Sequence, residues 1–274
     1  MNNISLALAH ARTLDIDGVE AQTLLLHVLQ RPLYDRAWLL MNDTLELTSD
    51  QQTHYQQALQ QLLDNLPLAY LTGVQAFHGL DLQVTPDVLV PRADTETLVD
   101  WALSLDLPQA RMLDLGTGSG AIALALKHKR PAWTVHAVDQ SAKALAVAQA
   151  NAHLLQLEVV FTQSDWLAQV QNTFDVIVAN PPYIAQADPH LPGLVHEPQS
   201  ALVSGPQGLD DLQAIIAQAT PFLNDQGWLM LEHGYDQAAA VCQLLLQNSF
   251  TEVQSRNDLA GIARCSGGRR AEVK

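Results

Sequence analysis

The spacing of apolar residues divides the 274-residue chain into two parts with different periodicity. In the segments 4–12, 18–30 and 50–66, apolar side chains recur every three or four positions, which places them on one face of a helix. We therefore expect residues 1–72 to form a small N-terminal helical bundle.

Two boundaries of this helical part can be predicted from local signals. Ser49 and Asp50 precede the last long helical pattern, and either residue is suited to cap its N-terminus. In residues 73–90, apolar and polar positions alternate and glycines provide turn signals. This pattern predicts a β-hairpin that links the helical bundle to the rest of the chain.

From residue 91 onwards, short apolar runs alternate with helical patterns. Alternation of this kind is typical of an α/β domain with a mostly parallel sheet and helices on both faces. We expect this domain to occupy residues 91–274. The strand-like runs are 111–115, 133–139, 158–162, 174–179 and 227–232, and the helical patterns are 121–129, 142–153 and 208–223.

Composition and charge narrow the classes of function. The chain is 48% apolar and carries a formal net charge of −15, so we expect a well-packed core and no general, direct binding of nucleic acid. Cys242 and Cys265 do not have the spacing of metal ligands, which indicates a disulfide-free cytoplasmic protein with no metal site. The first residues lack the features of a secretory signal, and no apolar run is long enough to span a membrane.

A glycine-rich turn between the first strand and the next helix is the clearest ligand signal. It reads Asp-Leu-Gly-Thr-Gly-Ser-Gly-Ala from Asp114 to Ala121, and glycines there allow positive φ and close approach of the backbone to a ligand. Asp139 ends the next strand, where a carboxylate can accept hydrogen bonds from ribose hydroxyls. We expect the cofactor to contact Gly116, Thr117, Gly118, Ser119, Gly120 and Asp139.

Both features suit any ligand that contains adenosine. Gly116, Gly118 and Ala121 also fit the loose fingerprint of dinucleotide-binding proteins. The full Asp-x-Gly-x-Gly-x-Gly arrangement more closely resembles the first motif of methyltransferases that use S-adenosyl-L-methionine. In such enzymes the glycines approach the methionine part and the ribose rather than a pyrophosphate.

Two residues after the third strand extend this expected cofactor site. Asp165 can accept a hydrogen bond from the adenine amine, and Trp166 can cover the ring. Each residue also has a structural interpretation, because Asp165 can cap a helix and Trp166 can pack in the core.

The sequence Asn-Pro-Pro-Tyr, residues 180–183, follows the fourth strand and predicts the reaction centre. The two prolines stiffen the turn and leave carbonyl groups without competing backbone donors. Asn180 adds a side-chain amide and Tyr183 a flat aromatic wall. Together they suit a planar –NH2 group held for in-line attack on a sulfonium methyl group, so we expect Asn180 and Tyr183 to be catalytic and Asn180, Pro181, Pro182 and Tyr183 to contact the substrate.

Over nearly its whole length, the chain resembles the bacterial release factor glutamine methyltransferases, the protein-(glutamine-N5) methyltransferase family. The resemblance rests on VPRADTETLVD (90–100), LDLGTGSGAIALAL, AVDQSAKALAVAQANA, QSDW, VANPPYI, the stretch from Asp188 to Leu212, and LMLEHG. It implies a class I, Rossmann-like methyltransferase domain behind a helical domain and a hairpin. It also implies a monomer that uses S-adenosyl-L-methionine to methylate the glutamine of the Gly-Gly-Gln motif in peptide chain release factors, with the helical domain helping to dock that protein.

The resemblance also suggests roles for individual residues. It implies cofactor contacts at Gly116–Gly120, Asp139, Trp166 and Asn180. It also places Arg92, Thr95 and Glu96 near the methionine end of the cofactor and the pocket wall, where we expect Arg92 and Thr95 to contact the substrate. Arg92 can alternatively serve as a structural ion pair. Glu197 and Glu232 can brace loops or sheet edges, and we assign neither a catalytic role.

The C-terminal tail departs from the family pattern of an apolar strand that ends in Gly-Arg. Cys265, Ser266 and Gly267 interrupt the apolar run here, which leaves the length and pairing of the last strand open.

Three other functions share parts of this pattern. Glutamine methyltransferases of ribosomal proteins have the same cofactor site and the same Asn-Pro-Pro-Tyr sequence. DNA N6-adenine methyltransferases have the motif as well, but they need a basic groove that this sequence does not provide. A non-catalytic binding module is disfavoured because the glycines and the amide-holding motif are intact.

Overall fold

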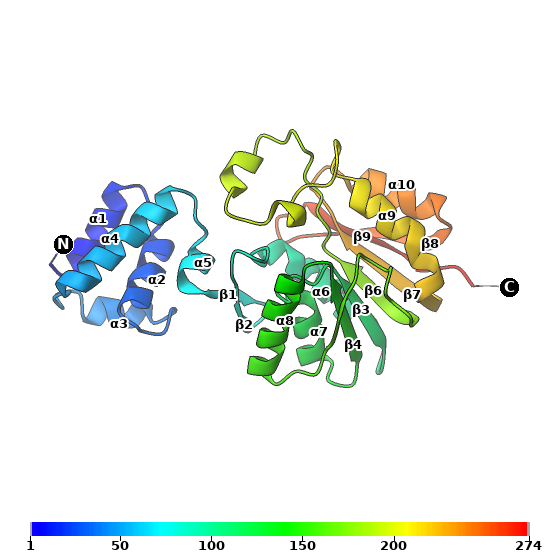
Figure 1. Ribbon diagram of the computed structural model, residues 1–274, viewed down its shortest axis with the longest axis horizontal. Helices are drawn as coiled ribbons and strands as arrows, with labels where there is room; N and C mark the ends of the chain where they lie inside the picture. Colours follow the sequence, from blue (N-terminus) through cyan, green and yellow to red (C-terminus); the bar gives the residue numbers. More distant parts are fainter. Residues whose placement is uncertain (1, 273–274) are drawn as a thin grey trace. The chain divides into compact units, whose positions relative to one another are not determined.

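The computed structural model describes residues 2–272, which fold into two compact units (Figure 1). The first unit runs through Val74 and includes Gly193–His196, and the second holds Gln75–Pro192 and the chain from Glu197 onwards.

Helices make up the first unit, as the periodicity predicts. They are α1 (Ile4–Thr13), α2 (Gly18–Val28), α3 (Arg36–Met41), α4 (Ser49–Leu63) and α5 (Leu68–Thr72). The short helices α3 and α5 were not predicted, because they are too short to show a periodic pattern. Leucines 24–26 and the Tyr55 ring are buried in the core, and the Tyr55 hydroxyl donates a hydrogen bond to the Ala21 carbonyl at 3.0 Å.

The cap of α4 differs from the prediction. Thr48, rather than Ser49 or Asp50, is the N-cap: its hydroxyl accepts from the Gln51 amide at 3.2 Å, and the Gln51 side chain accepts from the Thr48 amide at 2.9 Å. This is a reciprocal capping box. Ser49 cannot form the same box because Gln52 donates its side-chain amide to the Leu47 carbonyl instead.

The expected hairpin is confirmed, over a shorter range than residues 73–90. It consists of β1 (Val74–Phe77) and β2 (Leu80–Gln83). The two turn residues, His78 and Gly79, both have positive φ (48° and 80°), as a tight two-residue hairpin turn with the right twist requires.

The second unit contains a seven-stranded sheet with the order β5-β4-β3-β6-β7-β9-β8 (Figure 1). Strands β5 to β7 in this order are parallel to their neighbours, and β9 is antiparallel to both β7 and β8. The prediction of a mostly parallel, Rossmann-like α/β fold is therefore confirmed. The strands are β3 (Arg111–Leu115), β4 (Thr134–Asp139), β5 (Val160–Gln163), β6 (Phe174–Ala179), β7 (Leu223–Glu232), β8 (Phe250–Asn257) and β9 (Ala263–Arg270).

Five α-helices accompany this sheet in the described part of the second unit. They are α6 (Glu96–Leu103), α7 (Ala121–Lys129), α8 (Ala142–Leu155), α9 (Asp210–Ala219) and α10 (Ala238–Gln247). Four short 3-10 turns are also present: η1 (Ala93–Thr95), η2 (Leu191–Leu194), η3 (Gln199–Ala201) and η4 (Thr220–Phe222). The last two residues of η2 belong to the first unit. The sequence predicted α7, α8 and α9. It did not predict α6, α10 or the edge strand β8.

Helices cover both faces of the sheet because its strands alternate between two cores. Along β3, Met112 belongs to one core, whereas Leu113 and Leu115 belong to the other. Helices α6 and α7 supply buried side chains to the first core, and α9 and α10 supply them to the second. The hairpin residues Phe77, Leu80 and Leu82 are also buried in the first core.

The last strand is complete despite its small residues. Strand β9 runs unbroken from Ala263 to Arg270 and pairs on both sides, so the interruption seen in the sequence does not shorten it. Small residues are required there, because a Cβ added at Gly267 would lie 2.5 Å from the Leu229 carbonyl oxygen and 2.7 Å from the Trp101 ring. Trp101 of α6 supplies apolar contact at this point of the sheet.

Among the helices of residues 2–272, none has both the length and the apolar character needed to cross a bilayer.

Replacing Gly267 should therefore destabilise the second unit. We expect Gly267→Ala to lower the free energy of unfolding by about 1–3 kcal/mol, because the new methyl group must displace Trp101 or the β7 backbone. Urea denaturation measures this change. Gly193→Ala is the control, since its Cβ meets no atom within 4 Å. Equal stabilities for the two variants would contradict the close packing at β9.

Candidate active site

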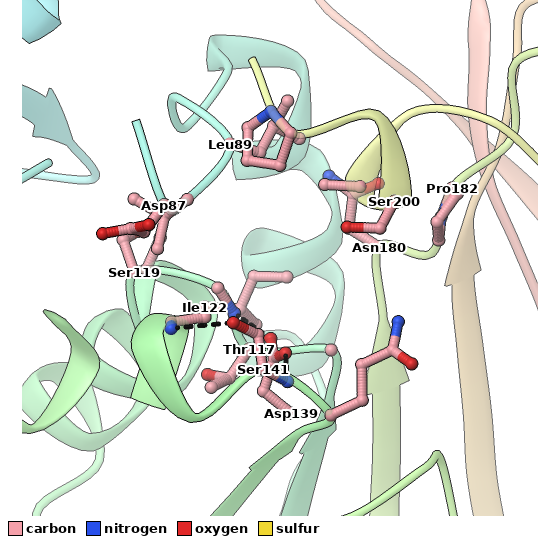
Figure 2. A pocket seen from close by; sticks show the side chains of 18 of the residues that line it. Asp87, Leu89, Thr117, Ser119, Ile122, Asp139, Ser141, Asn180, Pro182 and Ser200 are labelled. Atoms are coloured by element: carbon pink, nitrogen blue, oxygen red, sulfur yellow. Dashed lines mark hydrogen bonds between the residues drawn. The ribbon is translucent and has the colours of Figure 1, made fainter. Parts of the chain in front are cut away.

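A cavity of about 490 Å³ lies at the carboxyl edge of the sheet (Figure 2). The strand register places four strand ends there together, because Leu115 of β3 pairs with Val138 of β4 and with Ala179 of β6, and Asp139 pairs with Gln163 of β5. The residues that follow these positions are the ones that the sequence motifs singled out. This edge is where open α/β sheets bind their ligands.

Most of the predicted site residues line this cavity. Gly120, Pro181 and Tyr183 do not line it, although each is next in sequence to a residue that does. The predicted residues that do line it are Arg92, Thr95, Gly116, Thr117, Gly118, Ser119, Asp139, Asp165, Trp166, Asn180 and Pro182.

The glycine-rich turn has the conformation that glycine favours. Gly116, Gly118 and Gly120 have φ values of 70°, 55° and 85°. A Cβ at Gly116 would lie 3.1 Å from the Trp166 ring, so glycine lets the backbone and the indole form one wall of the cavity. Gly120 packs against α8, where its Cβ would lie 3.2 Å from that of Ala148. Gly120 thus joins two helices, whereas Gly116 shapes the binding surface.

The Asp139 side chain fastens this turn to the end of β4. One carboxylate oxygen accepts from the Gly118 amide at 2.9 Å, and the other accepts from the Ser141 amide at 2.8 Å (Figure 2). Burial raises the pKa of Asp139, and these two hydrogen bonds act in the opposite direction. Each oxygen keeps a second lone pair that can accept from a ligand hydroxyl.

Asp114 is a buried carboxyl group beneath the turn, and the sequence analysis did not assign it a role. Its Oδ2 accepts from the Thr117 hydroxyl at 2.6 Å and from the Ala123 amide at 3.3 Å, whereas Oδ1 has no hydrogen-bond partner in the described chain. Burial raises the pKa of Asp114 to about 7. Asp114 therefore holds the first residues of the turn and the start of α7.

The Trp166 side chain, in the segment after β5, both lines the cavity and packs against the core, as its structural interpretation described. The indole lines the cavity against Gly116, packs against the second core, and donates from Nε1 to Asp211 at 3.2 Å. The capping interpretation of Asp165 is wrong, because no α-helix follows it before β6. Ser164 organises the turn instead, since its hydroxyl accepts from the Gln169 amide and donates to the Trp166 carbonyl.

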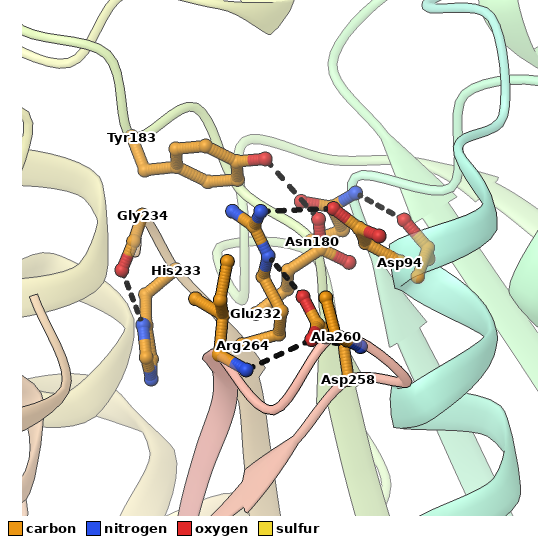
Figure 3. A network of polar contacts seen from close by, with 11 residues as sticks. Asp94, Asn180, Tyr183, Glu232, His233, Gly234, Asp258, Ala260 and Arg264 are labelled. Atoms are coloured by element: carbon orange, nitrogen blue, oxygen red, sulfur yellow. Dashed lines mark hydrogen bonds and ion pairs between the residues drawn. The ribbon is translucent and has the colours of Figure 1, made fainter. Parts of the chain in front are cut away.

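The Asn-Pro-Pro-Tyr segment turns away from β6 beside this wall. Asn180 lines the cavity, and its Nδ2 donates to the Thr95 hydroxyl at 3.2 Å. The Tyr183 hydroxyl donates to Glu232 at the end of β7, at 3.2 Å (Figure 3). Burial raises the pKa of Tyr183 above its ordinary range, so the phenol stays protonated at neutral pH.

Arg92 forms the ion pair that its alternative interpretation described. Its guanidinium contacts the buried carboxylate of Glu197, whose other oxygen accepts from the Val90 amide at 3.1 Å. Glu197 thereby ties the loop before η1 to the loop before η3. Both loops contribute to the cavity wall.

Sequence reasoning did not identify several lining residues. They come from loops without a motif or from the first turns of helices, so neither periodicity nor turn chemistry marked them as ligand contacts. They include Pro86, Asp87, Leu89, Ser141, Ser200, Val203 and Asp211. Within residues 2–272, no group of three or more His, Cys, Asp or Glu side chains is placed to hold a metal ion.

Comparisons with known proteins point to methyltransferases, both by sequence and by fold. Residues 94–261 match the family described as Methyltransferase small domain, and residues 1–73 match the PrmC N-terminal domain. A release factor glutamine methyltransferase of Xylella fastidiosa (strain 9a5c) is 45% identical, covering 96% of this chain and 97% of its own. One from Coxiella burnetii is 42% identical, covering 92% and 91%. A methyltransferase from Pyrococcus furiosus shares the fold, with a TM-score of 0.57 and 19% identity over 79% of this chain and 98% of that chain.

The raised pKa of Asp114 should make stability depend on pH. Because the pKa rises from 3.8 in the unfolded chain to about 7, the stabilising contribution is complete below pH 4 and is lost as pH rises through 7. We expect Asp114→Asn to remove this loss, on the order of 4 kcal/mol, and to flatten the decline in unfolding free energy between about pH 4 and 7. Urea denaturation across this range measures it. Parallel curves for the two proteins would contradict the assignment.

Proposed function

This chain belongs to the family of release factor glutamine methyltransferases, and on that premise we propose the reaction that its site performs. It transfers a methyl group from S-adenosyl-L-methionine to the side-chain amide nitrogen, N5, of the glutamine in the Gly-Gly-Gln motif of peptide chain release factors. The observation that carries this proposal is that Asn180, the first residue of the Asn-Pro-Pro-Tyr segment, lines the same cavity as the glycine-rich turn (Figure 2).

The residues at the carboxyl edge fit the cofactor. Asp139 is placed to accept from the ribose hydroxyls, and the backbone at Gly116 and Gly118 lets the ligand approach the sheet closely. Asp165 and Trp166 provide an acceptor and an aromatic surface for the adenine. When bound, S-adenosyl-L-methionine supplies an electrophilic methyl group on a sulfonium sulfur.

Asn180 and the prolines hold the substrate amide. Because Asn180 uses its Nδ2 on Thr95, its Oδ1 remains as the acceptor for one N–H of the glutamine. A carbonyl of the rigid Pro181–Pro182 turn accepts the other N–H, and Tyr183 backs the turn. Holding the nitrogen in line with the methyl group can contribute about 7–11 kcal/mol, and acceptors on both N–H groups favour the positive charge that develops on the nitrogen. Water takes the proton after transfer.

Three further parts of the proposal concern the oligomeric state, the cellular location and the docking of the release factor. We expect the chain to act as a monomer in the cytoplasm, where release factors work, and without direct nucleic-acid contact because its net charge is −15. The helical residues 1–72 dock the release factor, with residues 73–90 as the linker and 91–274 as the catalytic domain. Leu40 and Met41 of α3, which are 75% and 76% exposed, support such a docking role.

Release factors are favoured over a ribosomal protein as the substrate by the names of the relatives at 42% and 45% identity. Mass spectrometry tests this directly. The chain is incubated with S-adenosyl-L-methionine and an unmethylated release factor, and a ribosomal protein substrate is treated in parallel. A single added methyl group on the Gly-Gly-Gln glutamine supports the proposal. A methyl group elsewhere, or only on the ribosomal protein, would refute it.

Two substitutions should separate catalysis from cofactor binding. Asn180→Ala removes the amide acceptor, so we expect kcat to fall by about 100-fold or more while cofactor affinity changes little. Asp139→Ala removes the ribose acceptor and loosens the turn at Gly118, so we expect cofactor Kd to rise by about tenfold or more. Steady-state kinetics and calorimetric cofactor titration measure the two effects. An unchanged rate for Asn180→Ala would contradict the proposed amide clamp, in which Asn180 Oδ1 and a carbonyl of the Pro181–Pro182 turn hold the substrate amide.

A further inference from the structure

Glu232 is a buried carboxyl group that the reaction described above does not use. It ends β7, directly after Leu231, which is the register partner of Ala179, so it lies beside the start of the Asn-Pro-Pro-Tyr segment. The side chain is 1% exposed, and its Oε2 has no hydrogen-bond partner within the described chain. A carboxyl group buried this deeply at a ligand-binding edge calls for a physical role.

Two hydroxyl groups approach this carboxyl group, and they belong to Tyr183 of the Asn-Pro-Pro-Tyr segment and to Thr95, which contacts Asn180. Tyr183 donates to Oε1 at 3.2 Å (Figure 3). The Thr95 hydroxyl lies close enough to lower the pKa of the carboxyl group by hydrogen bonding. Thr95 in turn contacts Nδ2 of Asn180 at 3.2 Å. A continuous chain of contacts therefore runs from Asn180 through Thr95 and Glu232 to Tyr183, and we call these four residues the relay.

The chemistry of these groups fixes the direction of every hydrogen bond. An ionised carboxylate can only accept, so both hydroxyls must donate to it. Thr95 has a single proton, and once that proton is used on Glu232 its oxygen can only accept. The Asn180 amide must then present Nδ2 to Thr95, which leaves Oδ1 for the substrate.

We infer that Glu232 is a positioning residue for methyl transfer: through Thr95 it sets which end of the Asn180 amide faces the substrate, and through Tyr183 it anchors the wall behind the substrate. This inference rests on the proposed function, because it concerns the grip on the substrate amide. Glu232 itself touches neither the substrate nor the cofactor in this account.

The charged groups around Glu232 let this relay respond to pH. Burial raises the pKa of Glu232 to about 7, with a smaller contribution from Asp94 of η1, whereas the hydrogen bonds from Thr95 and Tyr183 and the charge of Arg264 act against that rise. Arg264 on β9 bonds both Asp94 and Asp258, at 3.1 and 3.0 Å. The neighbouring Cys265 thiol is neutral because burial raises its pKa. Below pH 7 the carboxyl group gains a proton that it must donate, which disturbs the direction of the relay.

Substitutions at both ends of the relay test the inference. We expect Glu232→Gln and Thr95→Val each to lower kcat by about tenfold or more, with cofactor Kd changed by less than about threefold. Thr95→Ser restores the hydroxyl and should recover most of the loss seen in Thr95→Val. Asp94→Asn is the matched control, since it removes a carboxylate near Tyr183 without a hydrogen bond to the clamp, and its kcat should stay near that of the unchanged protein.

Two readouts distinguish positioning from a merely structural brace. Thr95→Val should add almost nothing to Asn180→Ala, because Thr95 acts through Asn180. The fall of kcat towards low pH in the unchanged protein should be absent in Glu232→Gln. Additive losses in the double variant, equal rates for Thr95→Ser and Thr95→Val, or a Glu232→Gln variant as fast as the unchanged protein would each overturn the inference.

The same experiments separate this inference from the proposed function. If the unchanged chain puts no methyl group on the release factor glutamine, the proposed function fails. If it does, and the relay variants turn over normally while binding the cofactor, only the relay fails. Should Glu232→Gln not fold, the comparison of Thr95→Val with Thr95→Ser decides the matter alone.

Discussion

The hydrogen bond from Asn180 to Thr95 is the constraint on which the reaction centre depends. It joins the end of β6 to the 3-10 turn η1, a segment 85 positions earlier in the chain. An amide can present either its oxygen or its nitrogen, and only the oxygen can grip the N–H of another amide. In the arrangement inferred above, the Thr95 hydroxyl donates to Glu232, so it can only accept from Asn180 and thereby makes that choice. On this proposal, the specificity for a planar –NH2 group begins in the buried side chains Thr95 and Glu232.

The parallel sheet makes this arrangement possible by aligning strand ends. The register of β3, β4 and β6 places the glycine turn, Asp139 and Asn180 at one edge, and β7 adds Glu232 beside them. The same edge buries two carboxyl groups, Asp114 and Glu232, each with one oxygen that has no partner in the described chain. Burial without full pairing lowers stability. Each of the two carboxyl groups nevertheless holds a part of the proposed site, because Asp114 bonds Thr117 in the glycine-rich turn and Glu232 bonds Tyr183.

The sequence predicted what depends on local chemistry. Gly116, Gly118, Asp139 and Asn180 carry turn and edge signals within short motifs, and the structure brings them together at one cavity. Contacts that depend on register between distant segments could not be predicted in the same way. Glu232 meets Tyr183 and Thr95 only because β7 lies beside β6 and η1 packs nearby. Likewise, the small residues of β9 interrupt an apolar pattern in sequence, yet they are what the Trp101 ring and the β7 backbone demand in space.

The most direct test of the amide clamp is a crystal structure of this chain with S-adenosyl-L-homocysteine and a peptide that contains Gly-Gly-Gln. The account predicts that the glutamine nitrogen points at the cofactor sulfur, leaving the methyl position about 3–3.5 Å from the nitrogen, with Asn180 Oδ1 as one of its acceptors. A glutamine amide bound away from the glycine-rich turn would contradict the account. So would an Asn180 amide that turns Nδ2 towards the peptide.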